Sequence, residues 1–173
     1  MTNPVVIVEY DPQWPTLYEK EKKLIRKALE HRISGVEHIG STSVPNLGGK
    51  NIIDVMAGTR GPEEADQCLS PLEGIGYKSV TPEPDNPEWY YCLGKGQHSV
   101  GYHLHLVKYS SAHWKKHTIF RDFLRGNRQV AQEYYNLKKK LAERYGADRV
   151  GYTEAKSAFI ESVLAKASQS TRR

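Results

Sequence analysis

Residues 38–54 read HIGSTSVPNLGGKNIID, and the organisation of the chain can be worked out from this stretch. A turn of glycine, serine and threonine separates two apolar segments, residues 36–39 and residues 52–57. Short apolar runs bounded by turn residues are typical of buried β-strands. We therefore expect two strands here, and we expect the function of the protein to centre on the loop between them.

The remaining sequence contains further segments of both kinds. β-Branched and aromatic runs predict strands at residues 5–9, 77–80, 89–93 and 100–107, the last two as a hairpin. Apolar residues at helical spacing predict helices from residue 12, over residues 62–73, and in three segments after residue 110, the last spanning residues 153–164. This order of elements predicts an α/β fold, with a mixed β-sheet flanked by α-helices.

The composition is that of a globular domain with a hydrated surface. The 173 residues, 38% hydrophobic and 26% charged, predict a single domain over residues 1–167 and a disordered tail over residues 168–173. No apolar run approaches the ~18 residues of a membrane span, and the first ten residues lack the pattern of a secretory signal. Two cysteines, Cys68 and Cys92, predict reduced thiols rather than a disulfide framework. We therefore expect a cytoplasmic protein without a membrane partner.

The net charge of +5 is unevenly distributed. Residues 1–107 carry 10 Lys and Arg against 14 Asp and Glu, whereas residues 108–173 carry 15 against 6. A basic half can attract phosphate-bearing partners, although solvated helix faces would give the same count. Within it, Arg121 and Arg125 lie one helical turn apart and could grip phosphate, or could form a solvated face beside Asp122. The run at residues 138–140, three lysines, indicates exposed helix surface.

The turn at residues 40–43 is the first candidate site. Glycine lets the backbone approach a ligand closely, and amides and hydroxyls in such a turn can hold a phosphate. Lys50, and Lys156 near the start of the last helix, are candidate counter-charges. The pattern is neither a P-loop nor a dinucleotide fingerprint, so a purely structural turn is the alternative.

Asp54 is the second candidate, because a carboxylate on an apolar strand must be hydrogen-bonded, paired or bound to a metal. His103 and His105 alternate along a later strand and so share one face of the sheet. One Asp beside two imidazoles could bind Zn²⁺ or Mn²⁺, or could act as an acid–base set. Hydrogen bonding within the sheet is the structural alternative, and His38 is a further candidate member of the group.

A Gly-Ser turn followed about ten residues later by an acid on the next strand resembles the nucleotidyltransferase superfamily. In that superfamily, Gly-Ser holds a triphosphate and two carboxylates spaced as Asp-x-Asp bind Mg²⁺. Gly40, Ser41 and Asp54 match this pattern, but Met56 stands at the position of the second acid. The resemblance therefore implies the fold and a phosphate site, and it leaves open whether the protein is an enzyme.

Over residues 5–164 the chain also resembles the GrpB family, which is placed in that superfamily. The most specific match is EHIGSTSVP at residues 37–45, continuing to Lys50 and to IID at residues 52–54. Supporting matches are YDPQWP at residues 10–15, HLH at residues 103–105, FRDFLR at residues 120–125 and TEAKSAFI at residues 153–160. Asn46, Gly48, Gly49 and Asn51 depart from the residues usual in the family. The resemblance implies a nucleotidyltransferase-like fold.

These observations favour binding of a nucleotide or another phosphate-bearing small molecule, with metal-dependent nucleotidyl transfer as the candidate reaction. In this hypothesis the phosphate-binding residues are Gly40, Ser41, Thr42, Ser43, Lys50, Arg121, Arg125 and Lys156. The metal-binding or catalytic residues are Asp54, His103 and His105, with Mg²⁺, Mn²⁺ or Zn²⁺ as candidate ions. Two alternatives are a non-catalytic ligand-binding or regulatory module and a His/Asp metal-dependent hydrolase. A third alternative is a protein that binds a nucleic acid, RNA, through its basic helices, and it is weaker because the sequence contains no RNA-recognition motif.

Overall fold

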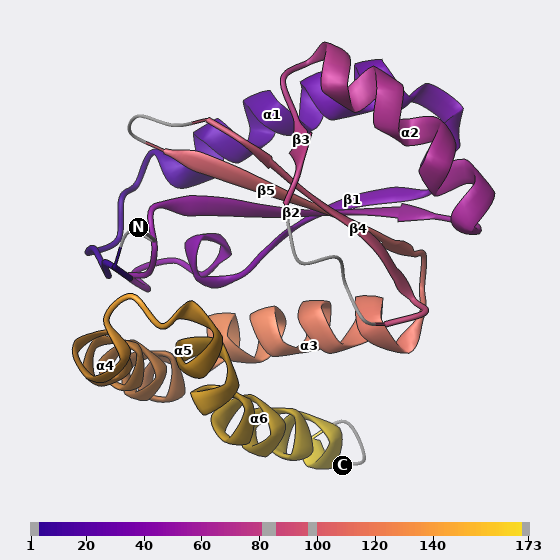
Figure 1. Cartoon of the computed structure of the whole chain (residues 1–173). Coiled ribbons are helices and arrows are strands. Elements are labelled where there is room, and N and C mark those ends of the chain that lie inside the picture. Colours follow the sequence, from indigo (N-terminus) through magenta and orange to yellow (C-terminus); the bar gives the residue numbers. More distant parts are fainter. Residues whose placement is uncertain (1–3, 81–85, 97–99, 171–173) are drawn as a thin grey trace.

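The computed structural model describes residues 4–80, 86–96 and 100–170 (Figure 1). Its elements follow one another as α1 (Trp14–Leu29), β1 (Gly35–Ile39), β2 (Ile52–Thr59), α2 (Pro62–Gly74), β3 (Lys78–Ser79), β4 (Trp89–Lys95), β5 (Gly101–Lys108), α3 (Ala112–Gly126), α4 (Arg128–Tyr145), α5 (Arg149–Ala155) and α6 (Ser157–Ser170), with short 3₁₀ helices at Glu30–Arg32 and Ser41–Ser43. None of the helices in these described ranges is both long and apolar enough to cross a membrane.

The strands form one five-stranded sheet in the order β1-β2-β5-β4-β3. β2 and β5 run parallel, and every other neighbouring pair is antiparallel. The expected mixed sheet and the expected hairpin of β4 and β5 are therefore confirmed. β2 lies inside the sheet with helices on both sides, which explains its nearly continuous apolar sequence.

Helices cover both faces of the sheet (Figure 1). α1 and α2 pack on one face, where Trp14, Ile25 and Leu72 form the main core with strand residues such as Val55 and Leu104. α3 packs on the opposite face, α4 and α5 lie beside one end of α3, and α6 lies on the far side of α3 from the sheet. The side chains of β2 and β5 that point toward α3 therefore face the boundary between the sheet and the C-terminal helices.

The loop after the Gly-Ser turn packs against both α3 and α4 at this boundary. Val44 and Leu47 are almost fully buried against Leu124 of α3 and Tyr134 of α4. This apolar contact brings α4 beside the turn, although about 90 residues separate them in the sequence.

Three expectations about the elements were wrong or only partly correct. The segment at residues 5–9 makes one isolated bridge, between Val8 and Gly49, and adds no strand to the sheet. Its β-branched residues serve helix packing instead, since Val5 packs against Leu141 and Tyr152. The predicted helix over residues 153–164 is divided between α5 and α6, because the Lys156 N–H bonds back to carbonyls of the last turn of α5.

The predicted disordered tail is also partly helical. α6 continues through residues 168–170, whereas residues 171–173 lie outside the described residues. The two cysteines are free thiols, with Cys68 buried and Cys92 half-buried.

Candidate functional site

The turn after β1 begins at Gly40, which has a φ of 70° and a ψ of −174°. This conformation is essentially restricted to glycine. A Cβ at this position would also lie 2.6 Å from Oδ2 of Asp54. Glycine is therefore required both by the backbone and by the close approach of the Asp54 carboxylate.

The three hydroxyls of the turn point in different directions. Ser43 Oγ donates to the Gly40 carbonyl at 2.6 Å, and Thr42 Oγ1 lies 3.0 Å from Nε2 of His38. Both side chains are buried, and these bonds hold the shape of the turn. The half-buried Ser41 Oγ instead accepts a hydrogen bond from Lys138 of α4 at 2.7 Å. Of the three hydroxyls expected to bind phosphate, that of Ser41 is the one paired with a lysine.

Asp54, His103 and His105 meet on one face of the sheet, as the strand alternation predicts. Asp54 Oδ1 lies 3.6 Å from His103 Nδ1 and 3.4 Å from His105 Nε2. Burial would raise the pKa of Asp54, but hydrogen bonds from the two imidazoles outweigh it and hold the pKa well below its usual range. Burial alone would lower the pKa of His105, whereas its hydrogen bonds with Asp54 and Cys92 raise it to about 9. His105 is therefore a cation paired with Asp54 at neutral pH.

His38 does not join this group. It pairs with Val55 in the sheet and so points to the opposite face from Asp54. There its ring stacks on Tyr18 of α1, with the two ring centroids 4.4 Å apart. Burial lowers the pKa of His38 to about 4, so the ring is neutral and supports Thr42 from behind the turn.

Asp54, His103 and His105 offer one carboxylate and two imidazoles to a metal ion. Mg²⁺ prefers oxygen ligands, so this set does not fit a site of the two-carboxylate type. Such a set suits Zn²⁺ or Mn²⁺ better, but both imidazoles here approach the same carboxylate oxygen. Across residues 4–80, 86–96 and 100–170, no three His, Cys, Asp or Glu side chains are arranged to hold a metal ion.

Three lysines, Lys50, Lys138 and Lys156, gather beside the turn, and we call them the lysine cluster. Lys138 is 2% exposed and also donates to the Gly48 carbonyl. The ammonium groups of Lys50 and Lys156 lie 4.7 Å and 4.4 Å from the centroid of the Tyr152 ring. Burial and the charges of the other two lysines lower the pKa of Lys138 to about 7. Burial and the charge of Lys50 lower that of Lys156 to about 8.

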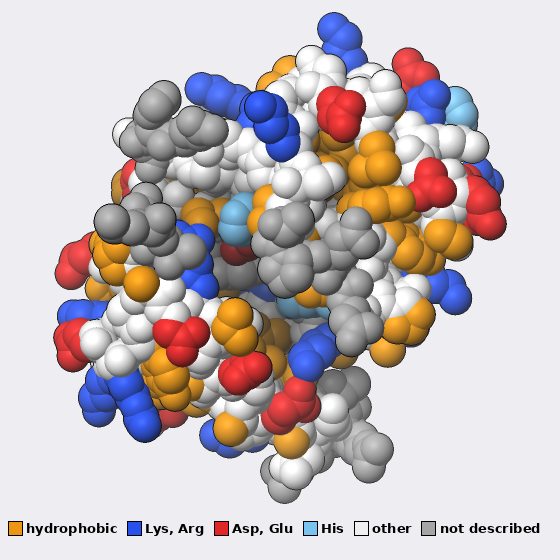
Figure 2. Space-filling model, viewed as in Figure 1, with side chains coloured by type: hydrophobic (Ala, Val, Ile, Leu, Met, Phe, Trp, Pro, Cys, Tyr) orange, Lys and Arg blue, Asp and Glu red, His pale blue; other side chains and the backbone are white. Residues whose placement is uncertain are grey.

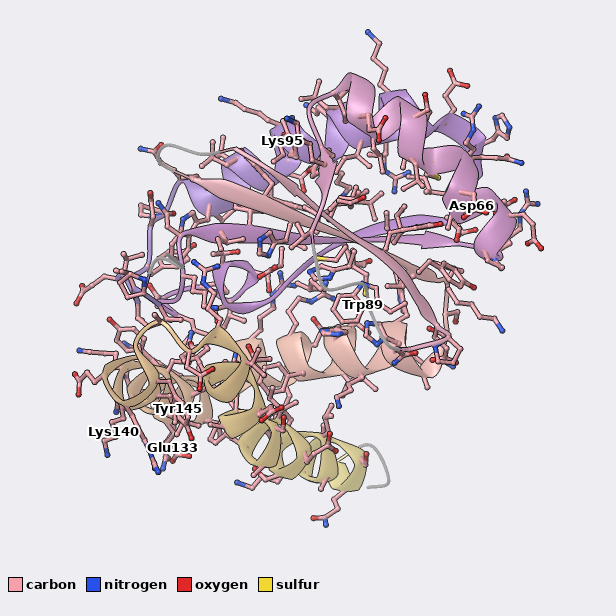
Figure 3. All side chains as sticks on the ribbon, viewed as in Figure 1. Asp66, Trp89, Lys95, Glu133, Lys140 and Tyr145 are labelled. Carbon is pink, nitrogen blue, oxygen red and sulfur yellow. The ribbon has the colours of Figure 1, made fainter. Side chains whose placement is uncertain are left out.

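Lys138 is the member of the cluster that the sequence did not reveal. Its position in a run of three lysines indicates exposed surface, and this holds for Lys139 and Lys140, both of which are exposed. Lys140 points away from the body of the protein (Figure 3). One feature of the sequence indicated that Lys138 is buried: it lies four residues after Tyr134 and three before Leu141, on the buried stripe of α4.

The two arginines of α3 brace the turn from its other side. Arg121 Nη1 bonds to a carboxylate oxygen of Glu37 at 2.5 Å and to the His38 carbonyl at 3.0 Å. Arg125 Nε donates to the Ser43 carbonyl at 2.9 Å. They share one helix face, as expected, but these bonds connect that face to β1 and to the turn backbone.

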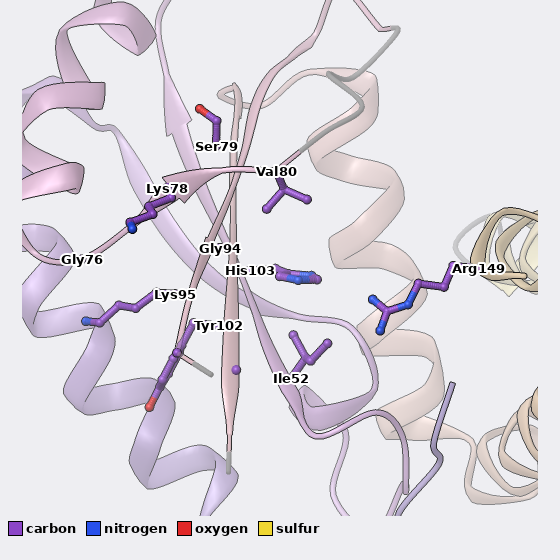
Figure 4. Close-up of a pocket in the computed structure, with 12 residues that line it drawn as sticks. Ile52, Gly76, Lys78, Ser79, Val80, Gly94, Lys95, Tyr102, His103 and Arg149 are labelled. Carbon is purple, nitrogen blue, oxygen red and sulfur yellow. The ribbon is translucent and has the colours of Figure 1, made fainter. Parts of the chain in front are cut away.

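A cavity of about 490 Å³ opens beside His103. Its lining includes Ile52 of β2, Tyr102 of β5 and Val80 after β3, and Arg149 of α5 reaches toward the sheet from the other side (Figure 4). The surface is hollowed between the sheet and the C-terminal helices, and histidine and basic side chains are visible in the hollow (Figure 2). His103 lines the cavity and its Nδ1 lies 3.6 Å from Asp54 Oδ1, so this side chain links the cavity to the Asp54 group. Its volume lies within the ~300–1,000 Å³ typical of small-molecule pockets.

The sheet topology, with the turn between β1 and β2, places the chain among proteins of the nucleotidyltransferase fold. It superimposes on the Cid1 poly(U) polymerase with Mg and 3′-dATP bound with a TM-score of 0.56 and 13% identity, over 79% of this chain and 43% of that chain. The chain belongs to the GrpB protein family, which it matches over residues 4–166.

Two relatives support this membership. A crystal structure of the conserved protein GrpB from Enterococcus faecalis has a TM-score of 0.83 and 32% identity, over 97% of this chain and 100% of that chain. A UPF0157 protein of Pseudomonas aeruginosa is 32% identical over 97% of this chain and 69% of its own length. The family and the fold expected from the sequence are therefore confirmed.

Proposed function

We propose that this protein binds a nucleotide or another phosphate-bearing small molecule, with the phosphates between the Gly-Ser turn and the lysine cluster. The observation that carries the proposal is the contact of Lys138 with Ser41. A lysine ammonium is costly to bury without an anion, and Lys138 has only neutral oxygens among its hydrogen-bond partners in the described residues. A phosphate oxygen beside Ser41 would supply the missing negative charge.

The cavity beside His103 would take the remainder of the ligand. Its lining combines apolar side chains such as Ile52 and Val80 with polar groups such as Lys78 and Tyr102. This mixture suits an organic group with a few hydrogen-bonding atoms. A nucleoside attached to phosphates has this character.

Nucleotidyl transfer is the reaction class that we propose for the site. Asp54 orients the imidazoles of His103 and His105. In such a transfer an acceptor oxygen would bond to the α-phosphorus of a nucleoside triphosphate as the bond to diphosphate breaks, and the protonated His105 would donate its proton to the departing diphosphate oxygen. If nucleotides bind without being turned over, the chain is instead a ligand-binding or regulatory module that kept the pocket. RNA as the partner would give binding that falls steeply with salt and depends on exposed lysines of α4.

Isothermal titration against a panel of nucleoside mono-, di- and triphosphates tests the proposal, both with and without Mg²⁺. Lys138→Met should weaken binding by about tenfold or more, because it removes a charge-assisted hydrogen bond. Lys140→Met, an exposed change on the same helix, is the matched control and should leave affinity unchanged. The proposal fails if no phosphate-bearing ligand binds, or if both variants weaken binding equally.

A His/Asp metal-dependent hydrolase is the second candidate, and it would require His103 and His105 to turn from Asp54 Oδ1, which lies within 3.6 Å of a nitrogen of each, toward a shared ion. Asp54, His103 and His105 would hold a Zn²⁺ or Mn²⁺ ion, which supplies Lewis acidity and an activated water when bound. Elemental analysis of the purified protein, compared with the His105→Gln variant, tests it. Stoichiometric Zn or Mn that the variant loses would favour this candidate over the first.

A further inference from the structure

Met56 occupies the place that a second carboxylate would need for a two-acid metal site. It lies two residues after Asp54 on the same face of β2 and pairs with His105 of the neighbouring strand. The side chain is fully buried, in a cluster with Ile39 and Trp114. Position 56 is therefore part of the apolar core under α3, and it supplies no second acid beside Asp54.

The region between the Gly-Ser turn and Tyr152 carries an excess of cations. The lysine cluster contributes Lys50 from the loop before β2, Lys138 from α4 and Lys156 from the junction of α5 and α6. The charge of Asp54 partly offsets Lys50 and Lys156, but Asp54 is already paired with His103 and His105. The cluster therefore gathers three lysines from three different parts of the fold, and the one carboxylate that offsets them is already paired.

The lysines repel one another in the ligand-free protein. The positive charges of Lys50 and Lys156 disfavour the ammonium form of Lys138, and Lys50 does the same to Lys156. The ring of Tyr152, beneath both Lys50 and Lys156, gives a weak cation–π contact rather than a counter-ion. A ligand with several negative charges would relieve this repulsion, and a ligand that brings its own divalent cation would relieve less of it.

We propose that Lys50, Lys138 and Lys156 bind a di- or triphosphate chain directly, with no divalent ion between protein and phosphate, an inference that rests on the phosphate-binding function proposed above. The lysines replace the positive charge that a metal supplies in two-carboxylate sites. Ser41, which is bonded to Lys138, adds a hydroxyl donor to the same phosphate oxygens. The ligand class is a free polyphosphate chain, alone or as the tail of a nucleotide.

Titration of the whole protein with inorganic pyrophosphate and with tripolyphosphate tests this, once in excess EDTA and once in excess Mg²⁺. We expect binding in EDTA to be as tight as in Mg²⁺ or tighter. Lys138→Met and Lys156→Met should each weaken binding in EDTA by about tenfold or more, and Lys140→Met should not. Two variants are used because Lys138 is deeply buried, whereas Lys156 lies at a helix junction and tolerates substitution more easily.

A second measurement does not depend on any variant. Anion binding should favour the protonated lysines, so near pH 8 the complex should take up protons, and the titration heat should change with the ionisation enthalpy of the buffer. Binding that appears only with Mg²⁺ or Mn²⁺, or binding in EDTA that Lys138→Met and Lys156→Met leave unchanged, would overturn the metal-free site and leave the proposed function standing. Absence of binding by any phosphate in either condition would instead remove the proposed function itself.

Discussion

The ammonium of Lys138 donates a hydrogen bond to the hydroxyl of Ser41 at 2.7 Å, across 97 positions of the sequence. The contact joins α4 to the turn after β1. It also places a cation where burial strongly disfavours charge. Lys138 therefore links α4 to the turn and also lies at the centre of the candidate phosphate site.

The stability of the protein should depend on pH through Lys138. In the folded protein its pKa lies at about 7 instead of the ordinary 10.5, because burial and the charges of Lys156 and Lys50 disfavour the ammonium. Between these values the unfolded chain holds more protons at this residue than the folded chain, so the free energy of unfolding rises with pH. From about pH 7 to about pH 10, wild type should gain on the order of 3 kcal/mol relative to Lys138→Met.

Urea unfolding of both proteins at several pH values measures this difference. Lys50, Lys156, Arg149 and Asp54 are the charged groups around the cluster, and they are present in both proteins, so the difference mainly isolates Lys138. Lys140→Met should follow wild type at every pH. A constant difference between wild type and Lys138→Met would show that Lys138 keeps an ordinary pKa in the folded state.

Gly40→Ala should destabilise the protein and disturb the site together. A residue with a Cβ pays about 1–3 kcal/mol in this backbone region, and the new methyl group would also meet the Asp54 carboxylate at 2.6 Å. We expect the free energy of unfolding to fall by about 2 kcal/mol or more. We also expect weaker phosphate binding, because the carboxylate and the turn must move apart.

Gly126→Ala is the matched control, because a Cβ there meets no atom within 4 Å and its backbone φ is ordinary. It should be neutral or stabilising by up to about 1 kcal/mol. Chemical denaturation gives the stabilities, and titration below the unfolding transition gives the affinities. Equal stabilities for Gly40→Ala and wild type would mean that the turn adapts easily.

Local patterns were sufficient to predict the sheet face that carries Asp54, His103 and His105. Side chains alternate along strands, so two histidines separated by one residue share a face, and an acid on an apolar strand needs partners. The strand pairing then completes the group, because β2 lies directly beside β5. The alternation of side chains along a strand depends only on residues that are neighbours in the sequence, so it can be predicted without the rest of the fold.

The place of Lys138 in the lysine cluster could not be predicted in this way, because its burial depends on packing between distant segments. Val44 and Leu47 pack against Leu124 and Tyr134, and this contact brings α4, which carries Lys138, beside the turn. The break at Lys156 likewise interrupts a helical stripe that continues in the sequence. The expected strand at residues 5–9 was wrong for the same reason, since Val5 packs against α4 and α5 instead of pairing in the sheet.

Arg121→Met should lower the free energy of unfolding, and it should not remove a contact with the phosphate. Arg121 is 9% exposed, and its guanidinium bonds to Glu37, to Asp122 and to the His38 carbonyl. Removing it leaves these acceptors without their donor, at a cost of about 2–4 kcal/mol. Thermal and urea unfolding test the loss, with exposed Arg128→Met as the control. Pyrophosphate affinity that falls as far as in Lys138→Met, with stability unchanged, would make Arg121 a ligand contact after all.

Met56→Asp tests whether a carboxylate at position 56 would complete a two-acid metal site with Asp54. Met56 is fully buried beside Ile39, Val107 and Trp114, so a carboxylate there would lie in apolar surroundings. We expect a loss of about 3 kcal/mol or more, whereas Met56→Leu, which keeps the volume, should cost less than about 1.5 kcal/mol. Mg²⁺ should not rescue Met56→Asp, because the new carboxylate would point into the core under α3 rather than toward the cavity. Urea unfolding of both variants with and without Mg²⁺ decides between these outcomes. If Mg²⁺ stabilises Met56→Asp but not Met56→Leu, β2 retains the geometry of a two-acid metal site. The lysines would then not be needed to replace the positive charge of a metal ion.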